Sequence, residues 1–108
     1  MKIDIKQLFF IHPKLRVMAV RLERDLAAEF TATSLFRIND NGVHGMLPLR
    51  GLDLSCKHSF FGLVVEDYIN KRWVYDPKRP EMKCCIFHDS GQGYHLHFQV
   101  HPNTIRKD

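Results

Sequence analysis

Three histidines and one aspartate, in two short stretches of this sequence, carry the side chains that bind transition-metal ions. His44 and Asp53 lie in the first stretch, VHGMLPLRGLD, and His95 and His97 lie in the second, YHLHFQV. Imidazole nitrogens and carboxylate oxygens are common protein ligands of zinc. A zinc ion with three such ligands keeps one position for water, so the chemistry to consider is hydrolysis. The two stretches are far apart in the chain, and the fold has to bring them together.

The second stretch predicts a β-strand over residues 94–100. Successive side chains of a strand point to opposite faces, so His95, His97 and Gln99 share one face, while a leucine and a phenylalanine take the other. We expect the apolar face to pack on a core and the polar face to look into a site. An exposed strand face that merely carries histidines is the alternative.

The first stretch contains a short apolar segment at residues 49–54, which follows the turn-forming sequence NDNG. Asp53 alternates with Leu52 and Leu54, so it can face away from the core. A carboxylate between two leucines is unfavourable unless a cation or hydrogen-bond donors satisfy it. The alternative is that Asp53 is a turn or helix-capping residue, although Ser55 is a better cap candidate for the helix that follows.

The rest of the pattern predicts an α+β fold with two main helices and a small, mostly antiparallel sheet. Apolar residues at helical spacing predict one helix over 13–29, and a broad apolar stripe predicts another over 56–73. Strands are expected at 30–38 and 81–88, and the turn DSGQG joins the latter to the strand at 94–100 as a hairpin. We expect the polar tail, NTIRKD, to be frayed.

The length of 108 residues predicts a single domain covering residues 1–108. A hydrophobic content of 44% supports a real core, and no apolar run approaches the roughly 20 residues of a membrane span, so we expect no membrane insertion. The N-terminus lacks the features of a signal peptide, so we expect synthesis as a cytoplasmic chain. Cys56, Cys84 and Cys85 are expected to be reduced, mostly buried thiols.

The formal net charge of +4 suits an anionic partner such as a bacterial cell wall, a membrane surface or nucleic acid. The basic residues are scattered rather than clustered, which argues against a nucleic-acid partner. A small nucleic-acid binder that stacks bases on the exposed aromatic rings of Phe60, Tyr75 and Tyr94 nevertheless remains an alternative.

Four features together resemble the superfamily of zinc D-alanyl-D-alanine carboxypeptidases and phage endolysin peptidases, which includes hedgehog-like domains. The opening IHPKL resembles the start of phage endolysins of this group, and TSLFR resembles the strand of the active-site arginine, which makes Arg37 its counterpart. The stretch from His44 to Asp53 resembles the zinc-binding histidine–aspartate pair, although it is longer than usual and contains Pro48. HLH resembles the closing element, and the resemblance spans about residues 13–100.

The resemblance implies Zn²⁺ as the cofactor, with His44, Asp53 and His97 as its ligands. It implies that His95 is the general base and that Arg37 steadies a developing oxyanion or holds a substrate carboxylate. His95 and His97 could instead both bind the metal. The implied function is that of a phage-encoded, endolysin- or carboxypeptidase-type peptidase that hydrolyses short peptide bonds of bacterial peptidoglycan at the cell wall. The oligomeric state is open, with a monomer expected.

A non-catalytic zinc-binding phage structural domain is the main alternative. In such a domain the metal stabilises the fold and protein ligands fill all four of its positions. Cys84, Cys85 and His88 are possible additional ligands for that purpose.

Overall fold

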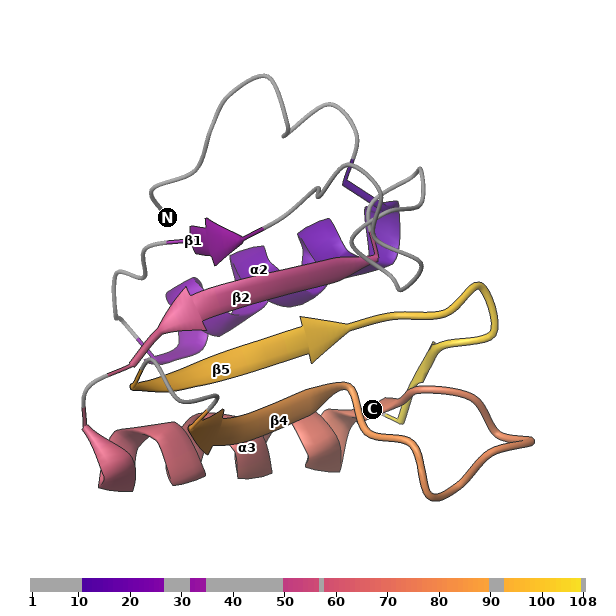
Figure 1. Cartoon of the computed structure of the whole chain (residues 1–108). Helices are drawn as coiled ribbons and strands as arrows, with labels where there is room; N and C mark the ends of the chain where they lie inside the picture. The colour runs from indigo at the N-terminus through magenta and orange to yellow at the C-terminus, as the bar shows by residue number, and fades with distance from the viewer. Residues whose placement is uncertain (1–10, 27–31, 35–49, 57, 90–92, 108) are drawn as a thin grey trace.

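The fold is α+β, as predicted, with two helices and a small antiparallel sheet in the described part of the chain (Figure 1). The computed structural model describes residues 11–26, 32–34, 50–56, 58–89 and 93–107. Its helices and strands are α2 (Pro13–Leu26), β1 (Ala32–Ser34), β2 (Gly51–Ser55), α3 (Ser59–Arg72), β3 (Trp73–Val74), β4 (Cys85–Asp89), β5 (Tyr94–Gln99) and β6 (Ile105–Arg106). Neither of these helices is both long and apolar enough to cross a membrane.

The main sheet has the strand order β1-β2-β5-β4, and each neighbouring pair is antiparallel. The hairpin predicted from the DSGQG sequence is confirmed, since β4 pairs with β5, and Gly93 has the positive φ of 101° that glycine adopts easily. Of the strand predicted at 49–54, the structure has β2 over Gly51–Ser55, which pairs with the other side of β5, and residue 49 lies outside the described residues. Both helices lie on the same side of this sheet, behind it in Figure 1. The opposite face of the sheet therefore carries every second side chain of β2 and β5.

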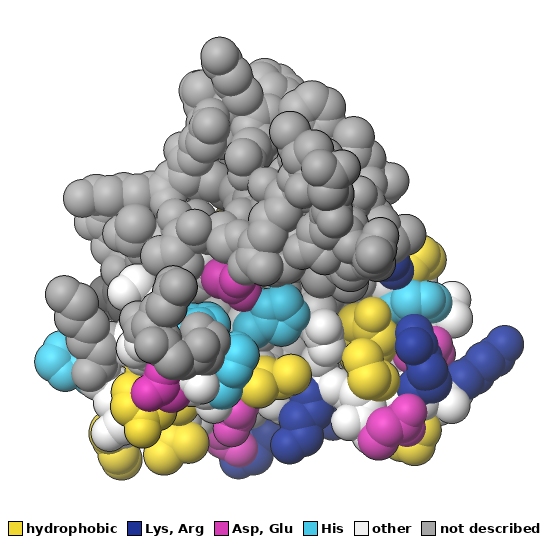
Figure 2. Space-filling view, in the orientation of Figure 1, with side chains coloured by type: hydrophobic (Ala, Val, Ile, Leu, Met, Phe, Trp, Pro, Cys, Tyr) yellow, Lys and Arg dark blue, Asp and Glu magenta, His cyan; other side chains and the backbone are white. Residues whose placement is uncertain are grey.

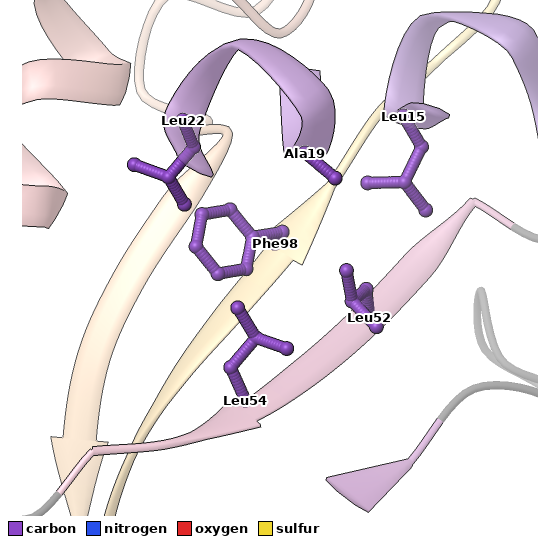
Figure 3. A pocket seen from close by; sticks show the side chains of 6 residues that line it. All are labelled: Leu15, Ala19, Leu22, Leu52, Leu54 and Phe98. Atoms are coloured by element: carbon purple, nitrogen blue, oxygen red, sulfur yellow. The ribbon is translucent and has the colours of Figure 1, made fainter. Parts of the chain in front are cut away.

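Alternation along the two central strands builds the core. Leu52 and Leu54 of β2 meet Phe98 of β5 and, from above, the side chains of Leu15 and Leu22 on α2 (Figure 3). All five are at most 2% exposed, and the space between them is too small for a water molecule. Burying side chains of this size stabilises a fold by roughly 1.5–3 kcal/mol each. The apolar stripe that predicted the first helix is thus its core-facing side.

Helix α3 is attached to the outer edge of β4 by two polar side chains one helical turn apart. Asn70 donates from its amide to the Cys85 carbonyl (2.9 Å) and accepts from the Cys85 N–H (3.1 Å). Glu66 accepts a hydrogen bond from the Phe87 N–H at 2.8 Å. Backbone groups of β4 that lie outside the sheet ladder are therefore satisfied by side chains. The same bonds fix the position of β4 beside β5.

The predicted helix limits are only partly right. The first helix is confirmed over Pro13–Leu26, and the remainder of the prediction to residue 29 lies outside the described residues. The second helix begins at Ser59 rather than 56, because Ser55 is still part of β2 and pairs with His95. The N-cap residue is His58, whose side chain makes no capping hydrogen bond, so the prediction that Ser55 caps this helix is wrong.

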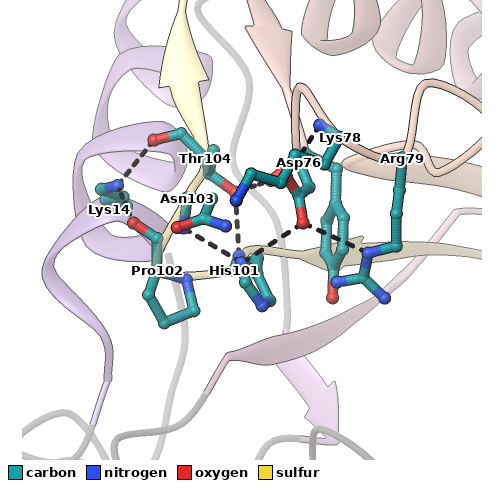
Figure 4. Close-up of polar contacts among 9 residues, drawn as sticks. Lys14, Asp76, Lys78, Arg79, His101, Pro102, Asn103 and Thr104 are labelled. Atoms are coloured by element: carbon teal, nitrogen blue, oxygen red, sulfur yellow. Dashed lines mark hydrogen bonds and ion pairs between the residues drawn. The ribbon is translucent and has the colours of Figure 1, made fainter.

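The prediction of a frayed C-terminal tail is also wrong. Ile105–Arg106 pair with Trp73–Val74 as a second, two-stranded sheet. Lys14 of α2 donates from its ammonium group to the Thr104 carbonyl at 2.6 Å, and the Thr104 hydroxyl donates to the Tyr75 carbonyl at 2.7 Å (Figure 4). These contacts hold the end of the chain against α2 and against the segment that follows β3.

Gly62 of α3 allows close packing on β4, because a Cβ atom there would overlap the ring of Phe87. We predict that Gly62→Ala lowers the free energy of unfolding by about 1–3 kcal/mol, since the ring has to leave its place against the helix. Urea unfolding followed by circular dichroism measures the change. Leu63→Ala, an exposed substitution in the same turn, is the control and should stay within about 0.5 kcal/mol. Equal effects of the two variants would contradict this account.

Asp76 is buried beside the C-terminal segment, and its pKa is lowered, chiefly because it accepts a hydrogen bond from the Lys78 N–H (Figure 4). A carboxylate whose folded pKa lies below its unfolded value stabilises the fold above about pH 4, and this contribution is lost as the pH falls through the folded pKa. Asp76→Asn should therefore be less stable than the parent at about pH 6, and the difference should shrink toward about pH 3. Denaturant unfolding across this range is the measurement, with the exposed Asp67→Asn as control. A difference that stays constant with pH would argue against the carboxylate as its source.

Candidate metal centre

Asp53 and His97 face each other at the centre of the sheet. The antiparallel register of β2 and β5 makes them direct partners, and Nδ1 of His97 lies 2.6 Å from Oδ1 of Asp53. Asp53 is buried, with 6% of its surface exposed, and His97 is half-buried. The carboxylate between two leucines thus has an imidazole as a partner, which resolves its predicted need for a cation or a donor. One nitrogen and one oxygen donor converge at this point of the polar face.

Gln99 contacts the ring nitrogen of His97 that does not face Asp53. The Gln99 amide donates to the Lys83 carbonyl at 2.7 Å, and its Oε1 lies 3.3 Å from Nε2 of His97. A carboxylate oxygen can only accept, so Nδ1 of His97 donates to Asp53 in the shorter of the two contacts. A metal ion bound between Asp53 and His97 would replace this hydrogen, and Nε2 would then carry the ring hydrogen and donate it to the Gln99 oxygen. A ligating histidine that donates its other ring N–H to an oxygen acceptor is the usual arrangement in metal sites.

His95 lies on the same face, one alternation further along β5. Its Nδ1 is 3.3 Å from the Gly93 carbonyl, which can only accept, so Nδ1 carries the hydrogen and Nε2 the lone pair. Its partners across the strands are Ser55 of β2 and His88 of β4. Histidine side chains accordingly gather in the middle of this face, next to acidic side chains (Figure 2). The strand register places His95, His97 and Gln99 on one face of the sheet, as predicted.

The other two predicted site residues, Arg37 and His44, lie outside the described residues. Within the part of the chain that the structure describes, no group of three or more His, Cys, Asp or Glu side chains is arranged to hold a metal ion. Asp53 and His97 offer an oxygen and a nitrogen of the kinds that bind zinc, and Gln99 offers an acceptor for the other ring nitrogen of His97. The third ligand predicted from the sequence is His44.

The cysteines are not available to this centre. Cys84 and Cys85 are free and fully buried, and Cys85 opposes Phe98, whose side chain is in the core. Burial raises the pKa of the Cys84 thiol to about 12 and that of the Cys85 thiol further, which disfavours the thiolate form that binds zinc. The expectation of reduced, buried thiols is confirmed. The suggestion that Cys84 and Cys85 join His88 as additional metal ligands is wrong.

The aromatic residues considered for stacking nucleic-acid bases do not form one platform. Phe60 and Tyr94 are 80% and 52% exposed, but Tyr75 is buried at 5%. The ring of Tyr75 lies 5.7 Å from that of His101, and the Arg79 guanidinium lies 5.3 Å from its centroid. A base therefore has no access to Tyr75, and that part of the nucleic-acid alternative is wrong.

Comparison of the chain with models of protein families, with curated proteins and with solved structures gives no match.

Gln99 is the residue of this centre to which the sequence assigned no role. Its place on the polar face follows from its spacing of two from His97, but its contact with the Lys83 carbonyl depends on where the chain runs before β4. His88 was considered only as an additional ligand of a structural zinc ion, and its contact with His95 depends on the hairpin register.

We predict that Gln99→Ala weakens the binding of Zn²⁺ to metal-free protein by about 10–100-fold, because His97 loses the acceptor that would hold its Nε2 hydrogen when Nδ1 binds the metal ion. Isothermal titration calorimetry gives the affinity. Gln99→Glu keeps an acceptor for the Nε2 hydrogen and should bind more tightly than Gln99→Ala. Ser55→Ala, on the same face, is the control. An unchanged Zn²⁺ affinity in Gln99→Ala would show that Gln99 does not position His97.

Proposed function

We propose that this protein is a zinc metallopeptidase that hydrolyses short peptide bonds of bacterial peptidoglycan, with a hedgehog-like peptidase fold. The single observation that carries the proposal is the pair formed by Asp53 and His97, with the Gln99 amide oxygen facing Nε2 of the imidazole. The pair lies on the face of the sheet opposite the two helices (Figure 1).

The proposed zinc ligands are Asp53, His97 and His44. The first two offer adjacent oxygen and nitrogen donors, and a third protein ligand leaves one position for water, as in catalytic zinc sites. The chemistry supplied by a bound zinc ion is Lewis acidity, which polarises a carbonyl group and lowers the pKa of water to about 7. A single carboxylate among the ligands keeps the centre cationic, which favours the developing negative charge of the reaction.

His95 is the proposed general base. Its Nδ1 hydrogen is directed to the Gly93 carbonyl, so Nε2 can accept a proton from the attacking water and later pass it to the leaving amine. Residues two apart on a strand are roughly 6.5–7 Å apart at the backbone, which suits a base that acts beside the metal at His97. The bond to the carbonyl orients the ring, as the third group does in other base-assisted sites.

Arg37 is the proposed group that steadies the oxyanion or holds a substrate carboxylate, on the strength of the motif TSLFR. The substrate class rests on the same resemblance and on the formal net charge of +4, which attracts an anionic cell wall. An endolysin- or carboxypeptidase-type activity of a bacteriophage enzyme, acting at the wall, is the version that these features favour.

The non-catalytic zinc domain has less support. It requires protein ligands at all four metal positions, and the two cysteines considered for that purpose are buried in the core. His97 is half-buried and His88 is exposed, so of these two histidines His88 is the more accessible to water.

The test separates the base from the metal ligands. His95→Ala should keep about one zinc per chain but lose at least about 100-fold of its peptidoglycan hydrolysis, whereas His97→Ala should lose both zinc and activity. Metal analysis of protein purified without added metal, together with release of amino groups from purified walls, gives the two quantities.

Three results would contradict the proposal. Full activity of His95→Ala would show that His95 is not the general base. Loss of zinc from His95→Ala would show that His95 is a metal ligand instead. A parent protein that binds zinc but cleaves no wall peptide would favour the structural domain.

A further inference from the structure

His88 and His95 form a second cluster of metal-ligating side chains beside Asp53 and His97. They are direct partners across β4 and β5, and their ring centroids are 4.5 Å apart at an interplanar angle of 63°. We propose that these two imidazoles bind a second transition-metal ion of the kind that prefers nitrogen ligands, such as Cu²⁺, Ni²⁺ or Zn²⁺. The ion would sit at the edge of the same sheet face, next to the first centre.

The nitrogen atoms of the pair support this assignment. Because Nδ1 of His95 donates to the Gly93 carbonyl, the lone pair of its neutral ring is on Nε2, away from the turn. This is the hydrogen-bonding pattern of a ligating histidine, with the second ring nitrogen held by a backbone carbonyl. His88 is exposed on the edge strand, so its ring can turn a nitrogen toward the same ion.

His97 cannot serve this second ion, although it is close in sequence. Its Nδ1 faces Asp53 and its Nε2 faces the Gln99 amide oxygen, so both ring nitrogens already have partners. The two centres are therefore separate, one with a carboxylate and one with two imidazoles. With two protein ligands and water in the remaining positions, the second ion is bound more weakly than one held by three protein ligands.

A bound second ion has a consequence for catalysis, and this part rests on the proposed function. Nε2 of His95 cannot accept a proton while it is bound to a metal ion, so occupation of the second centre removes the general base. Excess Zn²⁺ should therefore inhibit hydrolysis while the first zinc ion stays in place. Removing His88 should weaken this inhibition.

The experiment uses the full chain, stripped of metal, and titrates it with Zn²⁺ by calorimetry and with Cu²⁺ by electron paramagnetic resonance, which reports nitrogen ligands directly. The parent should take up two Zn²⁺ ions in a tight and a weaker step. His88→Ala should lose the weaker step and keep the tight one, and His97→Ala should do the reverse. His58→Ala removes an exposed histidine that makes no capping bond and should change neither step.

Each result bears on the inference. A weaker step that survives in His88→Ala, or a parent without a second step, overturns it. A step that depends on His88 in a protein without a tight zinc site supports the second centre while the proposed function fails. Inhibition by excess Zn²⁺ that is equally strong in His88→Ala overturns the inhibitory role, and circular dichroism of each variant verifies that the sheet is intact.

Discussion

The antiparallel register between β2 and β5 is the constraint on which the rest of the structure depends. It is fixed by burial, because Leu52, Leu54 and Phe98 all have to reach the core beneath α2. A shift of one residue would turn these side chains to the open face. The same register sets Asp53 opposite His97, so the packing of apolar residues on one face positions the polar groups on the other. The arrangement of the polar groups in the candidate centre therefore follows from the packing of the core.

Much of this could be predicted from the sequence because strand periodicity is local. The alternation in YHLHFQV is enough to place His95 and His97 on one face, and Asp53 between two leucines has to point away from the core. The helical stripe of α2 follows from spacing alone. The pairing of β2 with β5 is a long-range contact. The sequence supported this pairing only because the Asp53 carboxylate, placed between two leucines, needs a partner.

The parts that the sequence did not predict depend on contacts between distant segments. The tail was expected to fray because its residues are polar. Thr104 is nevertheless buried, and it forms hydrogen bonds with Tyr75 and Lys14 that a local sequence pattern cannot predict. Serine is a residue type that often caps helices, but Ser55 pairs with His95 and therefore extends strand β2 instead. Gln99 gains its role only through the Lys83 carbonyl.

Helix α3 affects more than the position of β4. In the described sheet, β4 is an outer strand, and such strands offer unpaired N–H and C=O groups to which another chain can add. Asn70 and Glu66 occupy these groups at Cys85 and Phe87. A strand from a second molecule would have to displace three hydrogen bonds before it could add there. The helix therefore protects this side of the protein from edge-to-edge aggregation, which matters for a small chain with an open polar sheet face.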